Sequence, residues 1–472
     1  MSWELLLLIA MVTMLVAFAL KVPVAIALTL AGFVGLTLAA DVSLAESALR
    51  QITYAANYNF LLVAIPLFIF MAEIFTATGM SSNAFGAVRT LFGSRRSAVP
   101  LSTIGLGALL AAVSGSSAAN VASLGRVAMD EMIAQGYRKP LAAGVVAVSG
   151  SLGIIIPPSI PAILYGFVNE ISVLAVFTAG VIPGLLIAGF SMLVTVLWVA
   201  RSERNDPVLA ERGHGHVRTG AHAANADDQP SEGDAAGSAP AADRSGASAE
   251  HAGPSSRLSA LFQLTPLLAL VGLVLGIIYA GVATPTEAAA IGCAGSIAVA
   301  ATGGGLTWGS LRLALDRSLR SSGFILLIIF GAVYFVFFLN YVQIPNQIVD
   351  LVVGANLGPT VTLIIAVVVM LILGTLMDTI SLVLVATPIL APVLVASGFH
   401  PLVVAIILLI LIEMGLNTPP VGLNIFIMLG VGKPFGVYYG DIVKGCLVYL
   451  IPGFATIGVI LLIPGIATMG SG

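Results

Sequence analysis

Two stretches of this sequence repeat each other and decide the fold: Ser114 to Pro158 and Thr375 to Pro420. Each begins in a small polar cluster, SGSSAAN at residues 114–120 and GTLMDT at residues 374–379. Each ends in a proline pair, GIIIPPS at residues 153–159 and GLNTPPV at residues 415–421. One numbering offset of 262, without a gap, aligns Ser116 with Asp378, Gly153 with Gly415, and Pro157-Pro158 with Pro419-Pro420.

Both polar clusters and both proline pairs interrupt apolar, helix-forming sequence. Hydrocarbon tolerates unpaired backbone N–H and C=O groups only where they are buried in protein or line a cavity, and transporters place their binding sites at such breaks. The alternative is that the glycines and prolines only kink packed membrane helices. Two breaks that recur at one offset in both halves favour a binding site.

The composition indicates a membrane protein. The chain has 472 residues, of which 58% are hydrophobic and 9% charged, and its mean hydropathy is +1.08. Soluble domains have roughly a quarter charged residues. The run from Leu5 to Leu20 lacks a preceding basic region and a cleavage site, so we expect a retained helix rather than a signal peptide. Cys293 and Cys446 stand singly in apolar sequence and predict no disulfide framework.

Apolar runs long enough to cross a bilayer as helices recur along the chain. The sequence predicts an all-α polytopic membrane protein with about ten crossings and two re-entrant helical hairpins. The expected helices are Leu5–Leu20, Val22–Ala40, Asn57–Thr78, Leu141–Phe167, Val173–Ala200, Leu258–Gly281, Pro285–Ala301, Gly323–Tyr341, Pro401–Val431 and Val443–Ile466, and the expected hairpins are Ser97–Gln135 and Pro359–Ser397.

The charges in the loops predict the orientation. With the Arg89, Arg95 and Arg96 loop in the cytoplasm, nearly all other loop lysines and arginines fall on the same side, and only Arg50 lies outside. The positive-inside rule then places both termini in the periplasm. Under this orientation the first hairpin opens from the cytoplasm and the second from outside. The repeat is therefore inverted, as in carriers that work by alternating access.

Five regions follow from this pattern. We expect scaffold helices at 1–96, a first transport repeat at 97–200, scaffold helices at 258–358 and a second transport repeat at 359–472. Residues 201–257 are rich in Ala, Gly, Ser, Asp and His and have few large aliphatic side chains. Such a segment buries too little apolar surface to fold, so it is predicted to be a disordered cytoplasmic linker.

Few ionisable residues lie in the apolar segments, where each costs about 2.5–3.5 kcal/mol at the bilayer centre. Asp378 stands in the second hairpin tip, where it is either an ion ligand or a cap for adjacent N–H groups. Glu287 follows Thr284 and Pro285 and is expected in a capping box. Glu413 precedes Asn417 and is expected either to bond its neighbours or to support the site, and Glu73 is expected to snorkel towards the cytoplasm.

Unwound helices supply carbonyl and hydroxyl oxygens, the ligands that sodium prefers. In the first repeat, Ser114, Ser116 and Ser117 face the break before Pro157. In the second, Thr375, Asp378 and Thr379 face Asn417, Thr418 and Pro419. The sequence therefore predicts two sodium sites. Proton coupling is less favoured, because the apolar segments contain no evident relay of carboxylates or histidines.

Two possible enzyme motifs lack residues that their chemistry requires. Gly115-Ser116-Ser117 is faintly similar to an intramembrane serine protease motif, but no expected membrane helix contains a histidine partner. Gly432-Lys433 is followed by Pro434 and is not a Walker A loop. We predict that the chain is not an enzyme, binds no cofactor other than coupling sodium ions and binds no nucleic acid.

Five motifs in one order resemble the large membrane subunit of tripartite ATP-independent periplasmic (TRAP) transporters. They are SGSSAAN at residues 114–120, GIIIPPSIPAILYG at 153–166, GVATPTEAAA at 281–290, GTLMDTIS at 374–381 and NTPPVGLNIF at 417–426. The resemblance covers both membrane halves and leaves out the linker. It departs at Asn120, where the family often has an acidic residue, and at Glu73, where a neutral polar residue is frequent.

The resemblance implies sodium-driven import of an organic acid across the bacterial inner membrane by an elevator-like movement. A periplasmic substrate-binding protein and a small four-helix membrane subunit are the implied partners, and we expect the small subunit not to be fused to this chain. An ion or solute channel with paired hairpins remains the alternative. The implied sodium sites consist of Ser114, Gly115, Ser116, Ser117, Gly153 and Pro157, and of Gly374, Thr375, Met377, Asp378, Thr379, Asn417, Thr418 and Pro419; Asn120, Ser159 and Asn424 are candidate substrate contacts.

Overall fold

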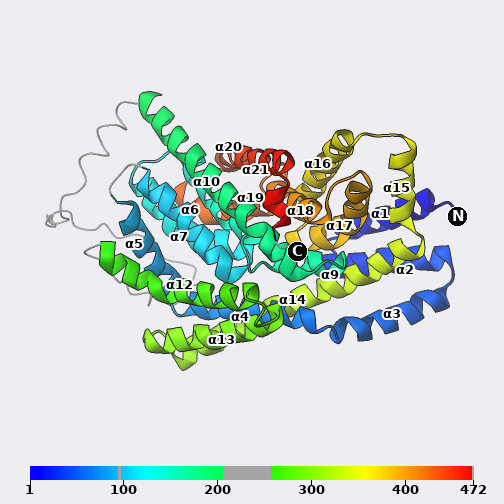
Figure 1. Ribbon diagram of the computed structural model, residues 1–472, viewed down its shortest axis with the longest axis horizontal. Helices are drawn as coiled ribbons and strands as arrows, with labels where there is room; N and C mark the ends of the chain where they lie inside the picture. Colours follow the sequence, from blue (N-terminus) through cyan, green and yellow to red (C-terminus); the bar gives the residue numbers. More distant parts are fainter. Residues whose placement is uncertain (94–96, 206–256, 470–472) are drawn as a thin grey trace, which may run out of the picture.

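A computed structural model describes residues 1–93, 97–205 and 257–469, and every regular element in these ranges is a helix (Figure 1). The predicted linker at 201–257 lies outside the described residues except at its two ends, which belong to the flanking helices α10 and α12. The prediction of an all-helical membrane protein is confirmed.

The first half contains ten α-helices and two short 3-10 helices within the described residues. They are α1 (Trp3–Ala19), α2 (Val24–Ala39), α3 (Val42–Asn57), η1 (Phe60–Val63), α4 (Ala64–Ala77), α5 (Met80–Phe92), α6 (Ala98–Ser114), α7 (Ser117–Ala134), α8 (Lys139–Ser151), η2 (Leu152–Ile154), α9 (Ile160–Val168) and α10 (Val173–Asn205).

The second half continues with the same kind of elements. They are α12 (Arg257–Tyr279), α13 (Pro285–Thr302), α14 (Trp308–Tyr341), α15 (Ile344–Gly354), α16 (Pro359–Leu376), α17 (Thr379–Ala396), α18 (Pro401–Leu416), α19 (Leu423–Gly432), η3 (Lys433–Phe435), α20 (Tyr439–Val448), α21 (Leu450–Leu462) and α22 (Gly465–Thr468).

The element bounds follow the repeat read from the sequence. Helices α7 and α17 begin and end at positions that differ by the predicted offset, and so do the ends of α6 and α16 and the starts of α8 and α18. Both hairpins are therefore pairs of helices broken at their polar tips. Both proline pairs, Pro157-Pro158 and Pro419-Pro420, contain a cis peptide bond.

Several helices were not among those expected from the sequence. Helices α3, α5 and α15 are amphipathic and short, and a search for apolar runs of membrane length does not find them. Asp41 precedes α3, where the Leu44 N–H donates to its carboxylate at 2.8 Å and thereby lowers the pKa of Asp41. Helix α14 was expected to begin at Gly323 but begins at Trp308, after Thr307, which caps it together with Ser310.

Seven helices in the described residues are long and apolar enough to cross a membrane by length and composition, and six shorter apolar helices accompany them. Helix α18 is the centre of the core, because every residue from Leu402 to Leu416 is buried. A helix that is apolar all round belongs inside a protein or a membrane bundle. It packs against α16, α17, α10 and α21.

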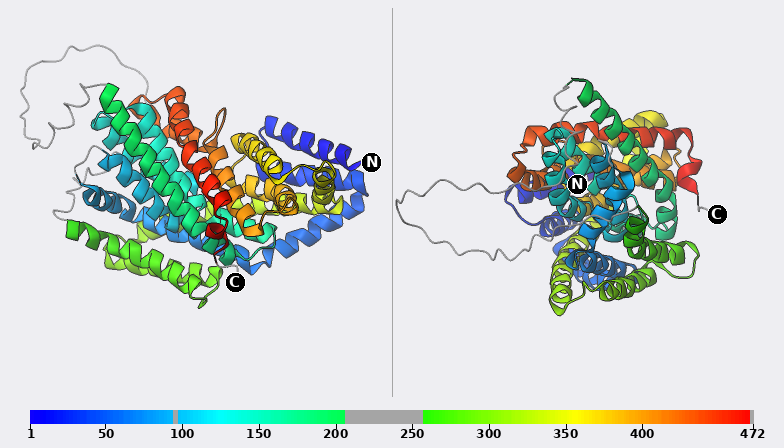
Figure 2. Two further views of the ribbon diagram at one scale, coloured as in Figure 1. Left: turned by 45° about the horizontal axis from the view of Figure 1, so that its top comes forward. Right: turned by 90° about the vertical axis from the view of Figure 1, so that its left-hand side faces the viewer.

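A second group of helices lies beside this core. Helix α14 packs along α2 and α4, and α4 packs against α13. Figure 1 shows α2, α3, α4, α12 and α13 along the lower side, with α16 to α21 above them. The left view of Figure 2 likewise separates the α12 and α13 pair from the C-terminal helices drawn in red. The groups meet where α14 contacts α17 and where α4 and α5 contact α6.

The contact between α2 and α14 depends on a glycine. A Cβ atom at Gly331 would lie 2.2 Å from the carbonyl oxygen of Ala25, and this backbone atom has no freedom to move aside. A Cβ atom at Gly323, on the same helix, would meet nothing within 4 Å.

We therefore expect Gly331→Ala to destabilise the protein by about 1–3 kcal/mol, the typical cost of overpacking. Gly323→Ala is the matched control and should leave the stability unchanged or slightly raised. The measurement is the thermal unfolding midpoint of each purified variant in detergent. Equal midpoints for the two variants would contradict the close helix contact.

Candidate functional site

The first hairpin tip lies against the first proline break. Gly115 has a positive φ of 56°, and a Cβ atom there would lie 3.1 Å from both the Pro158 carbonyl oxygen and the Ile160 nitrogen. A Cβ atom at Gly153 would lie 3.4 Å from the Ser116 backbone. Glycine is needed at position 115, because its φ is positive and the tip approaches the break backbone to backbone there, whereas Gly153 packs in ordinary contact with the tip. The residues predicted for the first sodium site are thus neighbours in the structure.

Polar side chains stabilise this first tip. The Ser114 hydroxyl donates to Asn120 Oδ1 at 2.7 Å, and Ser116 caps α7 by accepting from the Ala119 N–H at 3.5 Å. Asn120 is buried, and its Nδ2 has no hydrogen-bond partner among the described residues. That nitrogen faces Gly153 and lies 3.2 Å from the place that a Cβ atom would take there. Asn120 therefore directs one free polar atom at the break.

The second tip meets the second break in the same way. A Cβ atom at Gly374 would lie 2.6 Å from the Gly415 Cα, so α16 and α18 touch through two glycines. The Gly422 N–H donates to the Thr375 carbonyl at 3.1 Å, which joins the break directly to the tip. Met377 is buried in an extended conformation between α16 and α17. The residues predicted for the second sodium site are also neighbours.

Two hydroxyl groups of this second site use their protons in hydrogen bonds to carbonyl groups of the preceding helical turn. Thr375 donates to the Ile372 carbonyl at 2.8 Å, and Thr418 donates to the Met414 carbonyl at 2.7 Å. Since each hydroxyl has one proton and two lone pairs, these bonds leave its lone pairs available for a cation. The local structure therefore supplies neutral oxygen ligands without an added charge.

Asp378 is the N-cap of α17. Its Oδ2 accepts from the Ile380 N–H at 3.0 Å and from the Ser381 N–H at 3.3 Å, and its Oδ1 accepts a short bond from the Ser381 hydroxyl. The sequence left two roles open for Asp378, ion ligand and helix cap. The structure shows the contacts of a helix cap.

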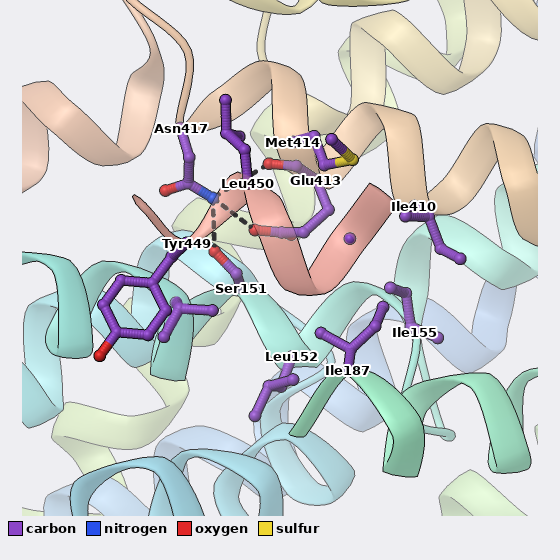
Figure 3. Close-up of a pocket in the computed structure, with 12 residues that line it drawn as sticks. Ser151, Leu152, Ile155, Ile187, Ile410, Glu413, Met414, Asn417, Tyr449 and Leu450 are labelled. Atoms are coloured by element: carbon purple, nitrogen blue, oxygen red, sulfur yellow. Dashed lines mark hydrogen bonds between the residues drawn. The ribbon is translucent and has the colours of Figure 1, made fainter. Parts of the chain in front are cut away.

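A buried polar cluster joins the two repeats, and Figure 3 shows the part of it around Glu413. Asn417 Nδ2 donates to Ser151 Oγ at 2.8 Å and to Glu413 Oε1 at 2.9 Å. Asn424 Nδ2 lies 3.0 Å from Ser117 Oγ and 3.2 Å from Ser151 Oγ. All five side chains are buried. Because Ser117 and Ser151 come from the first repeat and the others from the second, the cluster crosses the boundary between them.

Beside this cluster lies a cavity of about 20 Å³, lined by Glu413, Ser151 and Asn417 together with apolar side chains. Such a space holds about one water molecule. Glu413 Oε2 has no hydrogen-bond partner among the described residues. The expectation that Glu413 bonds its neighbours is confirmed by its contact with Asn417.

Ser151 was missed in the sequence, although the repeat contains a signal for it. The offset that aligns the proline pairs also aligns Ser151 with Glu413, so the two positions are equivalent in the two halves. Both bind the same Asn417 amide. A search for polar residues at corresponding positions of both breaks would have found the pair.

The candidate substrate contacts lie in different surroundings. Asn424 belongs to the central cluster and Asn120 to the first tip. Ser159 is fully buried, donates to the Ile154 carbonyl and caps α9 at Ala162.

Outside the hairpins, the capping box of Thr284 and Glu287 is present as expected. The Glu73 carboxylate lies 3.9 Å from the Arg317 guanidinium.

An all-helical membrane protein whose two repeats bring polar hairpin tips against broken helices has the architecture of a secondary transporter. The chain belongs to the family described as "Tripartite ATP-independent periplasmic transporter, DctM component", whose model matches residues 11–466. It is therefore a large permease of the TRAP type, as the resemblance implied, and not an enzyme.

Relatives agree with this assignment, and a solved structure shares the fold. The C4-dicarboxylate TRAP transporter large permease protein DctM of Pseudomonas aeruginosa is 32% identical over 81% of this chain and 80% of that protein. The isethionate TRAP transporter permease protein DctMQ of Oleidesulfovibrio alaskensis is 29% identical over 83% of this chain and 55% of that protein. The YdaH transporter of Alcanivorax borkumensis shares the fold, with a TM-score of 0.57, 17% identity and 89% of each chain covered.

The bond between Ser117 and Asn424 can be measured by a double-mutant cycle. We expect Ser117→Ala and Asn424→Ala to be coupled by about 0.5–1.5 kcal/mol in unfolding free energy, the usual net worth of a hydrogen bond. The control cycle pairs Asn424→Ala with Ser102→Ala, because Ser102 is equally buried but bonds Val99 within its own helix. Additive effects in both cycles would contradict the contact between repeats.

Asp378 gives a second prediction. Since both carboxylate oxygens bind the start of α17, Asp378→Asn should keep the half-maximal sodium concentration for uptake within about twofold of wild type. Asp378→Ala should lose about 1 kcal/mol of stability, the typical value of an N-cap. The measurements are sodium-dependent uptake at matched expression and thermal unfolding. A tenfold rise for Asp378→Asn would instead indicate that the carboxylate acts on the ion.

Proposed function

We propose that this chain imports an organic acid across the bacterial inner membrane, driven by a sodium gradient and dependent on a periplasmic substrate-binding protein. Two observations carry the proposal: each hairpin tip contacts its own broken helix, and a buried polar cluster joins the two repeats. Oxygen atoms at membrane depth are expensive unless they bind a ligand or one another. Here they come from both halves of the protein, as a coupled carrier requires.

Two sodium ions are the proposed coupling ions. In the first site, the ion would be held by carbonyl and hydroxyl oxygens of Ser114, Ser116 and the Gly153 to Pro157 break. In the second, the ligands would come from Thr375, Thr418, Asn417 Oδ1 and neighbouring carbonyls. Support comes from the close contacts between each tip and its break. Sodium prefers such hard oxygen ligands, and neutral ligands avoid the cost of a buried charge.

The proposed substrate is a small organic anion. The names of the two relatives given above specify C4-dicarboxylates and isethionate for those proteins. Asn120 and Asn424, as amide side chains near the tips, are candidates for contacting such an anion, and Ser159 is a third. Transport of the anion with sodium removes much of the electrostatic cost of crossing the bilayer, because charges partly cancel.

The proposed partners are a small four-helix membrane subunit and the periplasmic binding protein. The description of the family as tripartite supports them. The positive-inside rule supports periplasmic termini and a first hairpin that opens to the cytoplasm. We propose that the hairpins and α18 move together past the helices around α14 in an elevator-like step.

A channel is the competing function, because channels also use re-entrant hairpins. Close backbone packing at both tips favours a carrier. Gly115 and Gly374 are each in contact with the opposite break, which leaves no continuous open path at these points.

The test is uptake into proteoliposomes that contain this chain, its small subunit and the binding protein encoded beside it. We expect accumulation of an acid from a panel of carboxylates and sulfonates only when both the binding protein and an inward sodium gradient are present. Replacing sodium by potassium is the ionic control. Rapid flux without the binding protein and without the gradient would favour the channel.

A further inference from the structure

A large cavity lies between the first hairpin and the helices around α14. Its volume is about 420 Å³, within the range of about 300–1,000 Å³ that is typical of ligand pockets. One wall is formed by α4, α5 and α14 and carries Glu73 and Arg317. The other wall is formed mainly by α7 and carries Ser123 and Arg126. Figure 1 shows α4, α5 and α7 in the same part of the molecule.

The charges of this cavity do not balance. Arg126 forms no ion pair with any residue that the structure describes. Arg317 lies 3.9 Å from Glu73 Oε2, which is too long for a hydrogen bond, and this oxygen has no hydrogen-bond partner in the described chain. Two guanidinium groups thus face one carboxylate, and the donors of both arginines remain available.

The cavity also reaches the first hairpin tip. Ala119, in the first turn of α7, lines it, and the N-terminus of an 18-residue helix favours negative charge. The Ser123 hydroxyl donates to the Asn120 carbonyl at 3.2 Å, so the lining turn of α7 continues directly into the candidate site. The cavity therefore borders the first hairpin tip through Ala119.

We propose that this cavity is an anion-binding vestibule on the cytoplasmic release path, in which Arg126 and Arg317 bind the carboxylate or sulfonate group of the transported acid. The inference rests on the proposed function for the identity of the acid. Guanidinium groups bind such anions through two parallel hydrogen bonds. Glu73 competes for Arg317 and keeps the binding weak enough for release. Because Arg126 and Arg317 stand on opposite walls, an occupant would also bridge them.

The test uses a cysteine introduced by Ser123→Cys in the full chain and two thiol reagents of similar size. One reagent is anionic, sulfonatoethyl methanethiosulfonate, and the other cationic, trimethylammonioethyl methanethiosulfonate. The native Cys293 and Cys446 are buried, and the chain without Ser123→Cys measures any reaction with them. We expect the anionic-to-cationic rate ratio, divided by the same ratio for a small free thiol, to exceed one, with reaction from the cytoplasmic face in vesicles of known orientation.

Adding Arg126→Gln or Arg317→Gln should lower the anionic-to-cationic rate ratio by roughly tenfold, because removing one charge changes the two rates in opposite directions. Arg126→Lys keeps the charge and should keep the ratio. Arg320→Gln is the matched control, because Arg320 is on the same helix as Arg317, is not among the residues that line the cavity, and pairs with Asp316. A ratio that falls equally with Arg320→Gln, or does not fall with Arg126→Gln, would overturn the proposal.

Two arms separate the remaining explanations. Labelling is repeated in vesicles of phosphatidylcholine with and without phosphatidylglycerol. If the anionic-to-cationic rate ratio fell to about one only in the vesicles with phosphatidylglycerol, a lipid headgroup would fill the cavity. That outcome would also overturn the proposal. Because labelling requires no transport, it succeeds or fails independently of the uptake assay. A failure of import is therefore distinguishable from the absence of an anion site.

Discussion

The need to satisfy backbone polar groups away from water controls this structure. Each hairpin reverses its direction inside an apolar bundle and each proline pair interrupts a helix, so four breaks leave N–H and C=O groups without helical partners. The fold solves this problem by placing breaks against one another. The bond from the Gly422 N–H to the Thr375 carbonyl is the clearest instance. Glycine is required at Gly115, Gly374 and Gly415, because a Cβ atom there would force the two backbones apart.

The same constraint explains why the polar side chains gather at one place. Ser117, Ser151, Asn417 and Asn424 form bonds across the repeat boundary, and Glu413 joins them through Asn417; an isolated polar group there would cost about 1–3 kcal/mol. Such a network also couples the halves, since a displacement of α18 and α19 relative to α7 and α8 would break three bonds at once. A ligand that replaces these bonds would therefore change the relative stability of two arrangements of the repeats.

Much of this was predictable, and the failures have physical reasons. The hairpins, the broken helices and their pairing follow from a repeat of small polar residues and prolines, because those residue types force breaks in membrane helices. Helices α3 and α5 were missed because amphipathic helices at a membrane edge lack the long apolar runs used to find crossings. Ser151 was missed because a lone serine in an apolar helix usually bonds the preceding turn, as Ser151 also does with the Ala147 carbonyl. Its second bond, to the other repeat, is visible only in three dimensions.

Helix α14 has 34 residues and contains no proline, so it extends for about 51 Å as one continuous rod. This exceeds the hydrocarbon thickness of roughly 30 Å, and its arginine-bearing first turns therefore continue past the apolar core. One end carries Arg317 beside hairpin 1, while the rod also contacts α17 of hairpin 2. Both hairpins therefore lie against the same rigid helix. A joint movement of the two hairpins would therefore carry both of them along this one rod.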